Sequence, residues 1–507
     1  MNEPAPQSAA TARRYWPDLL AAAILLLGAC ILAGRIWRFP FDDELITLGA
    51  AERSKSAAEL VSFFGHGGDI HPPLSFLLFF FLHRLGWTEA AMRLCSIAMT
   101  ALALLLFQFL TLRTIAQRAA GEVRPATRVI AILLFGLCPL AIGQGDAIRW
   151  YPLFAILFAL FVILYLSSGS AAIRLCSAIP LGLAASTNFI AALLVGPLLI
   201  YRYGLQRAWR PAFELVYWLV FLIFAALGLW SAYSIVTEKF SHVMAVEFGS
   251  GHLRALAADA LGFFGGDAIG VSQAWAVLPA LVIAVFAVVA AVDRKRAANP
   301  MHLLLLTFAA VLPMVLTGFG KPRSFLYLAP VLAALVTLFL DRQTSKAPAW
   351  LALVALVLIP SVGAVANIEH GNAPFKRNAA IPYQQILDFI RLNARGAVLT
   401  VSTDPVVVWV LRHQHAASKN CVSRFLENKQ CFDADRHYDT VFSITGHSNL
   451  SANPPIMRNL EAALTRVTSG KQKVAEMSAG FDRDAAIKSR LTGVPLDPEI
   501  LSIAVYR

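Results

Sequence analysis

Charged residues are scarce in this sequence of 507 residues. Only 15% of the residues are charged, whereas 58% are hydrophobic. An average soluble domain is roughly 45–50% apolar and about 25% charged. The shortage of charge excludes an ordinary soluble protein, and the composition predicts a polytopic α-helical membrane protein.

Several motif classes are absent as well. The net charge is +12, but no basic stripe or nucleic-acid recognition motif accompanies it, so nucleic acid is not an expected partner. No nucleotide-binding Rossmann unit is recognisable in the chain. The polar C-terminal part lacks a glycine-rich phosphate loop, a metal-ligand spacing and a nucleophile elbow. These absences point away from nucleotide-dependent chemistry.

Cysteine is also rare, with only 6 in the chain. Four of them lie in apolar segments, where a free cysteine behaves as a small hydrophobic residue. Cys421 and Cys431 lie in the polar C-terminal part. In an oxidising compartment these two form either a disulfide or two free thiols, and both alternatives stay open.

The loops between the apolar runs alternate in charge. Arg113–Arg128 holds four Arg and one Glu, and the loop at 293–296 reads DRKR. On the other side, Arg38–Glu89 holds seven acids and four bases. By the positive-inside rule, this alternation predicts about 11 transmembrane helices, a cytoplasmic N-terminus and an extracytoplasmic C-terminal part. We therefore expect a multi-pass protein of the bacterial inner (cytoplasmic) membrane.

The predicted organisation has two domains. Residues 1–366 form the transmembrane domain, with outer loops at 38–90 and 236–273, and residues 367–507 form a small periplasmic α/β domain in which strands alternate with helices. The first outer loop contains an amphipathic stripe at Ala57–Phe64 and a short apolar run at Pro72–Gly86. Both are predicted to be juxtamembrane helices at the outer interface.

Ionisable residues gather at the predicted outer face. The segment FPFDDEL carries Asp42, Asp43 and Glu44, and GGDIHPPL carries Asp69 and His71. Two further turns supply Asp146, Arg149 and Tyr151 in QGDAIRWYP, and Lys321 and Arg323 in GFGKPRS. Ionisable groups at such a membrane edge are candidates for function by default.

Such a set of groups suits one reaction in particular. A carboxylate accepts a proton from an attacking hydroxyl, while nearby cations stabilise a departing phosphate. A donor with a phosphate and a long lipid tail reaches this place laterally from the bilayer. The set therefore predicts sugar transfer from a polyprenyl-phosphate donor to an envelope glycan or lipid, such as lipopolysaccharide.

Four blocks of the sequence resemble a known family, the polyprenyl-phosphate-dependent glycosyltransferases of the C-type fold. FDDELITLGA is similar to the family's W-x-D-E-A start of the first outer loop, and DIHPPLSFLLFFFLHRLGWTEAAMRL to its D-x-H-P-P-L-Y block. QGDAIRWYPLFAIL and KPRSFLYLAPVLAAL resemble two later helix starts. The resemblance covers about residues 15–340 and includes lipid A aminoarabinose transferase, rhizobial galacturonosyltransferases and, more distantly, protein O-mannosyltransferases.

The resemblance implies an inverting transfer in which an Asp of the first outer loop is the base. On the matching positions the base is Asp43, with Glu44 as its companion. Asp42 is an extra acid that competes for this role, and QGDAIRWY is one residue longer than the family's pattern, which leaves Asp146 loosely placed. The implied donor phosphate and substrate site consists of Asp69, His71, Asp146, Arg149, Tyr151, Lys321 and Arg323.

Alternatives remain beside this prediction. No cofactor is required, or a divalent cation, Mg²⁺ or Ca²⁺, is bound by Asp43 and Glu44. His66, Asp69 and His71 form an alternative set for zinc. A lipid-linked sugar flippase, a protein O-glycosyltransferase and a non-catalytic scaffold are the alternative functions. A transporter favours mid-membrane charges on broken helices and internal repeats, and neither is recognisable here.

Overall fold

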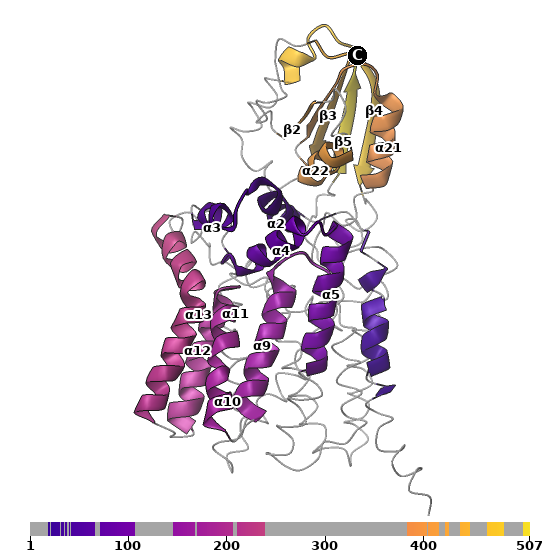
Figure 1. Ribbon diagram of the computed structural model, residues 1–507. Coiled ribbons are helices and arrows are strands. Elements are labelled where there is room, and N and C mark those ends of the chain that lie inside the picture. The colour runs from indigo at the N-terminus through magenta and orange to yellow at the C-terminus, as the bar shows by residue number, and fades with distance from the viewer. Residues whose placement is uncertain are drawn as a thin grey trace, which may run out of the picture. The chain divides into compact units, whose positions relative to one another are not determined.

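A computed structural model describes residues 19–106, 145–238 and 383–507, apart from short gaps at 21, 31, 35, 38–39, 41, 66–70, 168–169, 206–209, 403, 415–420, 425–436, 447–463 and 481–499. The chain divides into two compact units (Figure 1). One comprises Met1–Trp37 and Ile46–Phe375, and the other comprises Arg38–Leu45 and Lys376–Arg507.

The described helices upstream of residue 240 are mostly apolar. Two of them, α5 and α13, are long and apolar enough to cross a membrane, and the predicted outer-loop helices are confirmed as helices α3 and α4. The elements are α2 (Asp42–Arg53), α3 (Ala57–Gly65), α4 (Leu74–Arg84), α5 (Glu89–Leu106), α9 (Trp150–Ser167), α10 (Ala171–Cys176), α11 (Ala178–Ala185), α12 (Ile190–Leu199), the π-helix η2 (Ile200–Leu205) and α13 (Pro211–Glu238). The predicted number of spanning helices and the predicted loop at 236–273 fall largely outside the described residues.

Helices α3 and α4 pack on each other and on the longer helices. The rings of Phe64 in α3 and Phe76 in α4 stack with centroids 3.9 Å apart. α3 contacts α13, and α4 contacts α9 (Figure 1). The backbone N–H of Leu74 donates to the carbonyl of Ser186 at 3.1 Å, which fixes the start of α4 beside the end of α11. Because His71 precedes α4 by three residues, this anchor also limits where His71 can lie.

Helices α11 and α13 approach each other closely through small residues. A Cβ atom added to Gly182 would meet the carbonyl oxygen of Phe221 at 2.6 Å, and one added to Gly228 would overlap the backbone of Ala185. The hydroxyl of Ser186 donates to the carbonyl of Phe224 at 2.8 Å and accepts from the N–H of Gly228 at 3.2 Å. Small residues with an interhelical hydrogen bond are typical of helix packing in membranes.

The second unit contains a five-stranded mixed sheet in the order β2-β1-β3-β5-β4. β1 is parallel to β2 and β3, whereas β5 is antiparallel to β3 and β4. The elements are α21 (Tyr383–Asn393), β1 (Val398–Ser402), α22 (Pro405–Gln414), β2 (Cys421–Arg424), β3 (Thr440–Gly446), β4 (Lys473–Gly480) and β5 (Ile500–Tyr506).

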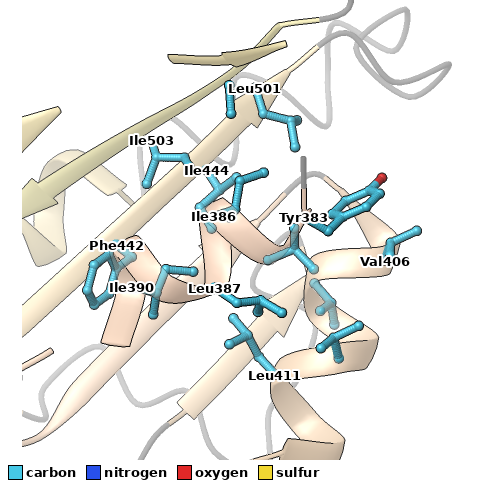
Figure 2. Packing of buried hydrophobic residues seen from close by; sticks show 14 of the residues in the cluster. Tyr383, Ile386, Leu387, Ile390, Val406, Leu411, Phe442, Ile444, Leu501 and Ile503 are labelled. Atoms are coloured by element: carbon cyan, nitrogen blue, oxygen red, sulfur yellow. The ribbon is translucent and has the colours of Figure 1, made fainter. Parts of the chain in front are cut away.

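One face of this sheet and the helices α21 and α22 share a hydrophobic cluster (Figure 2). Side chains alternate along a strand, so Phe442 and Ile444 face this cluster while Val441 belongs to a second one. Asp404 caps α22, because its Oδ1 accepts from the N–H groups of Val406 and Val407 at 2.8 and 2.9 Å. The sequence of residues 403–414, TDPVVVWVLRHQ, suits either a helix or a strand, and this cap explains why it is a helix.

Candidate active site

A cationic and aromatic group, buried except for the partly exposed His71, lies where α9 begins. We call it the histidine cluster, and it consists of His71, Phe76, Arg149 and Trp150. Nη2 of Arg149 lies 3.4 Å from Nδ1 of His71, and its guanidinium lies over the ring of Phe76 at 5.3 Å. The rings of His71 and Trp150 are 5.4 Å apart. Arg149 is only 3% exposed, so a permanent positive charge is held here away from solvent.

The contact between Arg149 and His71 restricts the hydrogen-bonding roles of the two side chains. An arginine side chain donates hydrogen bonds and does not accept them. A hydrogen bond across this contact therefore requires Nδ1 of His71 to be the acceptor, in the tautomer that carries its proton on Nε2. The cluster thus offers a guanidinium and an imidazole N–H, both of which are donors to an anion.

Local structure explains the placement of Arg149 and Trp150. The hydroxyl of Thr100 in α5 donates to the carbonyl of Gly145 at 3.1 Å and ties down the turn that precedes α9. Pro152 lies in the first turn of α9, where its missing N–H breaks no helical hydrogen bond. The amino end of a helix also carries a partial positive charge. Both the side chains and the backbone at this end therefore favour a negative ligand.

Trp150 is a candidate site residue that sequence reasoning missed. Its side chain is 1% exposed, yet its indole N–H has no hydrogen-bond partner among the described residues. The hydroxyl of Ser75, one residue before Phe76, is likewise buried without a partner in the described structure. An unsatisfied buried donor costs about 1–3 kcal/mol. A ligand with acceptor oxygens would recover this cost at Trp150.

The acids of FPFDDEL begin a helix. Asp42, Asp43 and Glu44 occupy the first turn of α2, where carboxylates are favoured by the helix dipole. Glu44 is completely buried, which exceeds what a solvated helix cap requires. The side chains of Asp42 and Asp43 lie outside the described residues, so the structure does not test which of the two is the base.

The other predicted site residues divide into two groups. Asp146 and Tyr151 flank the histidine cluster in sequence and are buried, at 0% and 4% exposure, and the rings of Trp150 and Tyr151 are 4.3 Å apart. Asp69, Lys321, Arg323 and Cys431 lie outside the described residues, and so does the side chain of Cys421. The structure therefore brings His71 and Arg149 together and leaves the remaining predicted cations and the disulfide untested.

The metal prediction is also untested. Among the described side chains, no group of three or more His, Cys, Asp or Glu is arranged to hold a metal ion. Asp43 and Asp69, which are predicted to bind a cation, are not among the described side chains.

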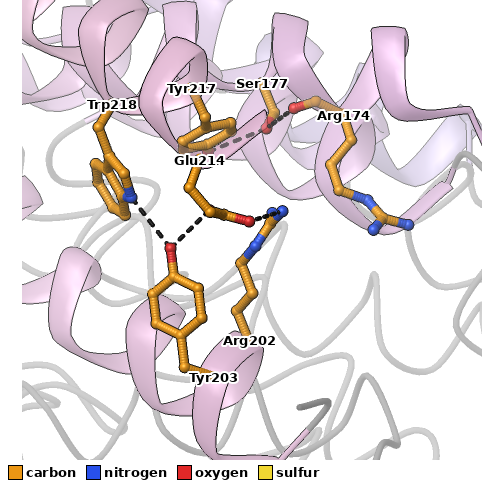
Figure 3. A network of polar contacts seen from close by, with 7 residues as sticks. All are labelled: Arg174, Ser177, Arg202, Tyr203, Glu214, Tyr217 and Trp218. Atoms are coloured by element: carbon orange, nitrogen blue, oxygen red, sulfur yellow. Dashed lines mark hydrogen bonds and ion pairs between the residues drawn. The ribbon is translucent and has the colours of Figure 1, made fainter. Parts of the chain in front are cut away.

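A second polar group lies near the other end of α9 (Figure 3). We call it the glutamate network, and it consists of Arg202, Tyr203, Glu214 and Trp218. Glu214 forms an ion pair with Arg202 and accepts a hydrogen bond from the hydroxyl of Tyr203 at 2.6 Å. Trp218 donates to the same hydroxyl at 3.2 Å. The charged groups of Arg202 and Glu214 are each 5% exposed. Arg202 begins a basic segment, Arg202–Arg210, that holds three Arg and no acid and reads as a loop in the sequence, whereas the structure buries Arg202 against Glu214.

The π-helix η2 supplies two members of this network. Arg202 and Tyr203 are neighbours in the chain, yet both side chains reach the carboxylate of Glu214 (Figure 3). Nearby, the hydroxyl of Ser177 lies 3.2 Å from that of Tyr217, and the guanidinium of Arg174 lies 5.9 Å from the ring of Tyr165 in α9. Because Glu214 engages both of its oxygens with its own chain, we read the network as structural.

Comparison with known proteins shows similarity at the level of structure. No protein-family profile matches the sequence, and no curated protein matches it. ArnT from Cupriavidus metallidurans in the apo state has a TM-score of 0.52 at 12% identity, over 97% of this chain and 98% of that one. The same protein bound to undecaprenyl phosphate has a TM-score of 0.49 at 12% identity, over 96% and 98%.

The arabinofuranosyltransferase AftD from Mycobacteria has a TM-score of 0.38 at 15% identity, over 97% of this chain and 40% of that one. The match to apo ArnT, a lipid A aminoarabinose transferase, shows that this chain shares the glycosyltransferase C-type fold. The membrane fold predicted from four sequence blocks is thereby confirmed. At 12% identity, this structural similarity establishes the fold alone, and the reaction must be argued from the site.

Proposed function

We propose that the protein transfers a sugar from a polyprenyl-phosphate donor to a glycan or lipid of the bacterial envelope, with inversion at the anomeric carbon. The observation that carries this proposal is the histidine cluster. The buried guanidinium of Arg149, the partly exposed imidazole of His71 and the buried indole N–H of Trp150, which has no partner among the described residues, lie together where α9 begins. Three donors and one permanent positive charge suit a phosphate better than a neutral ligand.

In the proposed reaction, a hydroxyl of the acceptor attacks the anomeric carbon from the face opposite the phosphate. An acid of the first turn of α2 takes the hydroxyl proton as general base. We assign this role to Asp43, with Glu44 as its companion and Asp42 as the competing acid. The bond between the anomeric carbon and the phosphate oxygen breaks, and its electron pair leaves on the polyprenyl phosphate.

The cluster supports the second half of this step. Negative charge grows on the phosphate as the bond breaks, and the buried Arg149 and the partly exposed His71 stabilise it. In the same proposal Lys321 and Arg323 supply further cations, and Asp69, Asp146 and Tyr151 complete the substrate site. If the reaction uses Mg²⁺ or Ca²⁺, Asp43 and Glu44 would hold the ion.

The proposed placement follows the sequence topology. The reaction takes place at the outer face of the inner membrane, with the N-terminus in the cytoplasm and residues 367–507 in the periplasm. The acceptor is a lipid or glycan of the envelope, such as lipopolysaccharide, and the sugar is a pentose or a hexose. The alternative functions are those of a flippase and of a protein O-glycosyltransferase, and a transfer assay in detergent distinguishes both from the proposed function.

The test uses the purified full-length protein in detergent micelles. A panel of synthetic polyprenyl-phosphate pentoses and hexoses is offered with an envelope glycolipid extract, and the products are identified by mass spectrometry. We expect one donor to release polyprenyl phosphate only when the extract is present. A flippase has no turnover without a membrane, so no release from any donor would contradict the proposal. Release that requires a polypeptide instead of the extract would move the acceptor to protein.

A further inference from the structure

The segment that carries the three acids belongs to the same compact unit as the C-terminal domain. This unit comprises Arg38–Leu45 and Lys376–Arg507, whereas Ile46 onward belongs to the unit of transmembrane helices. The boundary falls inside α2, one residue after Glu44. The predicted transmembrane domain, residues 1–366, includes Arg38–Leu45, whereas the structure groups this segment with the C-terminal residues.

A side-chain contact explains this grouping. Leu45 is partly buried and packs against the hydrophobic cluster that α21, α22 and the sheet share. That cluster is the core of the C-terminal domain, with Ile386, Phe442 and Ile503 completely buried in it. Leu45 directly follows Glu44 and is two residues from Asp43. The C-terminal domain therefore packs on a side chain next to the proposed base.

The position of Leu45 matters because of where helices are weakest. The first turn of a helix lacks intrahelical partners for its N–H groups, so helix ends fray. A base that acts in an inverting transfer must be held accurately, and a displacement of about 1 Å costs roughly 100-fold in rate. The first turn of α2 thus needs an anchor, and Leu45 supplies apolar contact at that turn.

We propose that Leu45 is a positioning residue through which the C-terminal domain holds the acid segment in its reactive place. The inference rests on the proposed function, because it takes the base to lie in the first turn of α2. It assigns the domain a role in the transfer step itself, beyond any role in binding an acceptor. Losing the contact should lower kcat while donor binding, which we assign to the histidine cluster, is kept.

The experiment compares two substitutions of the same type in the full-length protein. Leu45→Ala removes the anchor, whereas Leu392→Ala removes an 82% exposed leucine on α21 of the same domain. With the donor that the wild type turns over, we expect Leu45→Ala to lower kcat about 10- to 100-fold with KM for the donor unchanged. Leu392→Ala should keep both constants. Leu45→Met, which conserves volume, should restore kcat to within about threefold.

Hydrogen exchange supplies a readout that does not depend on turnover. The amides of residues 42–45 should exchange faster in Leu45→Ala than in the wild type, and at the wild-type rate in Leu392→Ala. If Leu45→Ala fails to fold, Leu45→Val applies the same test with a smaller expected effect.

Two results would overturn the inference: wild-type kcat in a folded Leu45→Ala variant, or a loss that appears only in KM. These failures are distinguishable from failure of the proposed function. If Asp43→Asn and Asp42→Asn are both fully active, the assignment of the base is wrong. If Asp43→Asn is inactive while Leu45→Ala is fully active, only the role of Leu45 is wrong.

Discussion

The two buried polar groups at opposite ends of α9 are built differently. About 15 residues of helix, or roughly 22 Å, separate the ends at which Trp150 and Tyr165 lie. In the glutamate network a carboxylate takes an ion pair on one oxygen and a hydrogen bond on the other. In the histidine cluster, a buried indole N–H has no acceptor in the described structure. In the first group both carboxylate oxygens meet side chains of the same chain, although Nε and Nη1 of Arg202 have no hydrogen-bond partner in the described structure. The second group holds no carboxylate among its four members, and its donors suit an added anion.

This difference separates structural burial from functional burial. Removing one member of a buried ion pair leaves an uncompensated charge, so damage to the glutamate network should appear in stability. Damage to donors that meet a ligand should appear in activity. Matched substitutions in the two groups should therefore separate the two kinds of burial.

The largest expected effect is on stability, for Glu214→Gln. The variant keeps the size of the side chain but leaves the guanidinium of Arg202 buried without its counter-charge. Such a loss costs about 3–5 kcal/mol. Denaturant unfolding in detergent should show this decrease, whereas turnover per folded molecule should stay at the wild-type value. An unchanged unfolding midpoint would show that the network does not stabilise the folded protein.

The matched substitution in the other group is Arg149→Gln. Removing a preorganised charge from a developing oxyanion site lowers kcat by about 100- to 1,000-fold. We expect a loss of this size in the transfer assay, with an unfolding midpoint close to that of the wild type. If Arg149→Gln proves as unstable as Glu214→Gln but keeps its turnover, Arg149 is structural and the contrast between the two groups fails.

Trp150→Phe tests the unsatisfied indole N–H alone. The substitution keeps an aromatic ring against His71 and Tyr151 and removes the donor. If the N–H binds the donor phosphate, kcat/KM should fall about tenfold, which corresponds to about 1.4 kcal/mol. Stability should not fall by a comparable amount, because no hydrogen bond within the described chain is lost. Wild-type kcat/KM would exclude Trp150 from the site.

The same substitution in the glutamate network should have the smallest effect. Trp218→Phe removes the hydrogen bond from the indole to the hydroxyl of Tyr203. A hydrogen bond of this kind contributes about 1 kcal/mol. We expect a decrease of that size in the free energy of unfolding and no change in kcat/KM. An activity loss larger than that of Trp150→Phe would reverse the roles of the two groups.

Sequence reasoning succeeded where the signal was local. The stripe at Ala57–Phe64 and the apolar run after Pro73 form α3 and α4. The segments AVLTVS, DTVFSIT and ILSIAVYR, whose apolar and β-branched residues predict strands, form β1, β3 and β5. β2 and β4 were missed. Both are edge strands, and edge strands are short or carry charges that weaken the hydrophobic pattern, as Lys473 and Glu476 do in β4.

The site could be predicted in part for a similar reason. His71 and Arg149 are charged or titratable residues at a predicted membrane edge, so the sequence marks them, and the structure places them 3.4 Å apart. Trp150 looks like any aromatic residue at a helix start, because its unsatisfied N–H exists only once its surroundings are packed. The contact of Leu45 could not be predicted from the sequence for the same reason, since its partners lie more than 330 residues away in sequence.

The most direct test of the account is a comparison of Asp43→Asn with Asp42→Asn in the purified full-length protein. Each substitution removes one negative charge from the first turn of α2 and nearly preserves its shape. We predict that Asp43→Asn has no measurable transfer but still folds, while Asp42→Asn keeps most of its activity. Loss of transfer in Asp42→Asn alone would assign the base to Asp42. Wild-type transfer in both variants would contradict the claim that these acids perform the reaction.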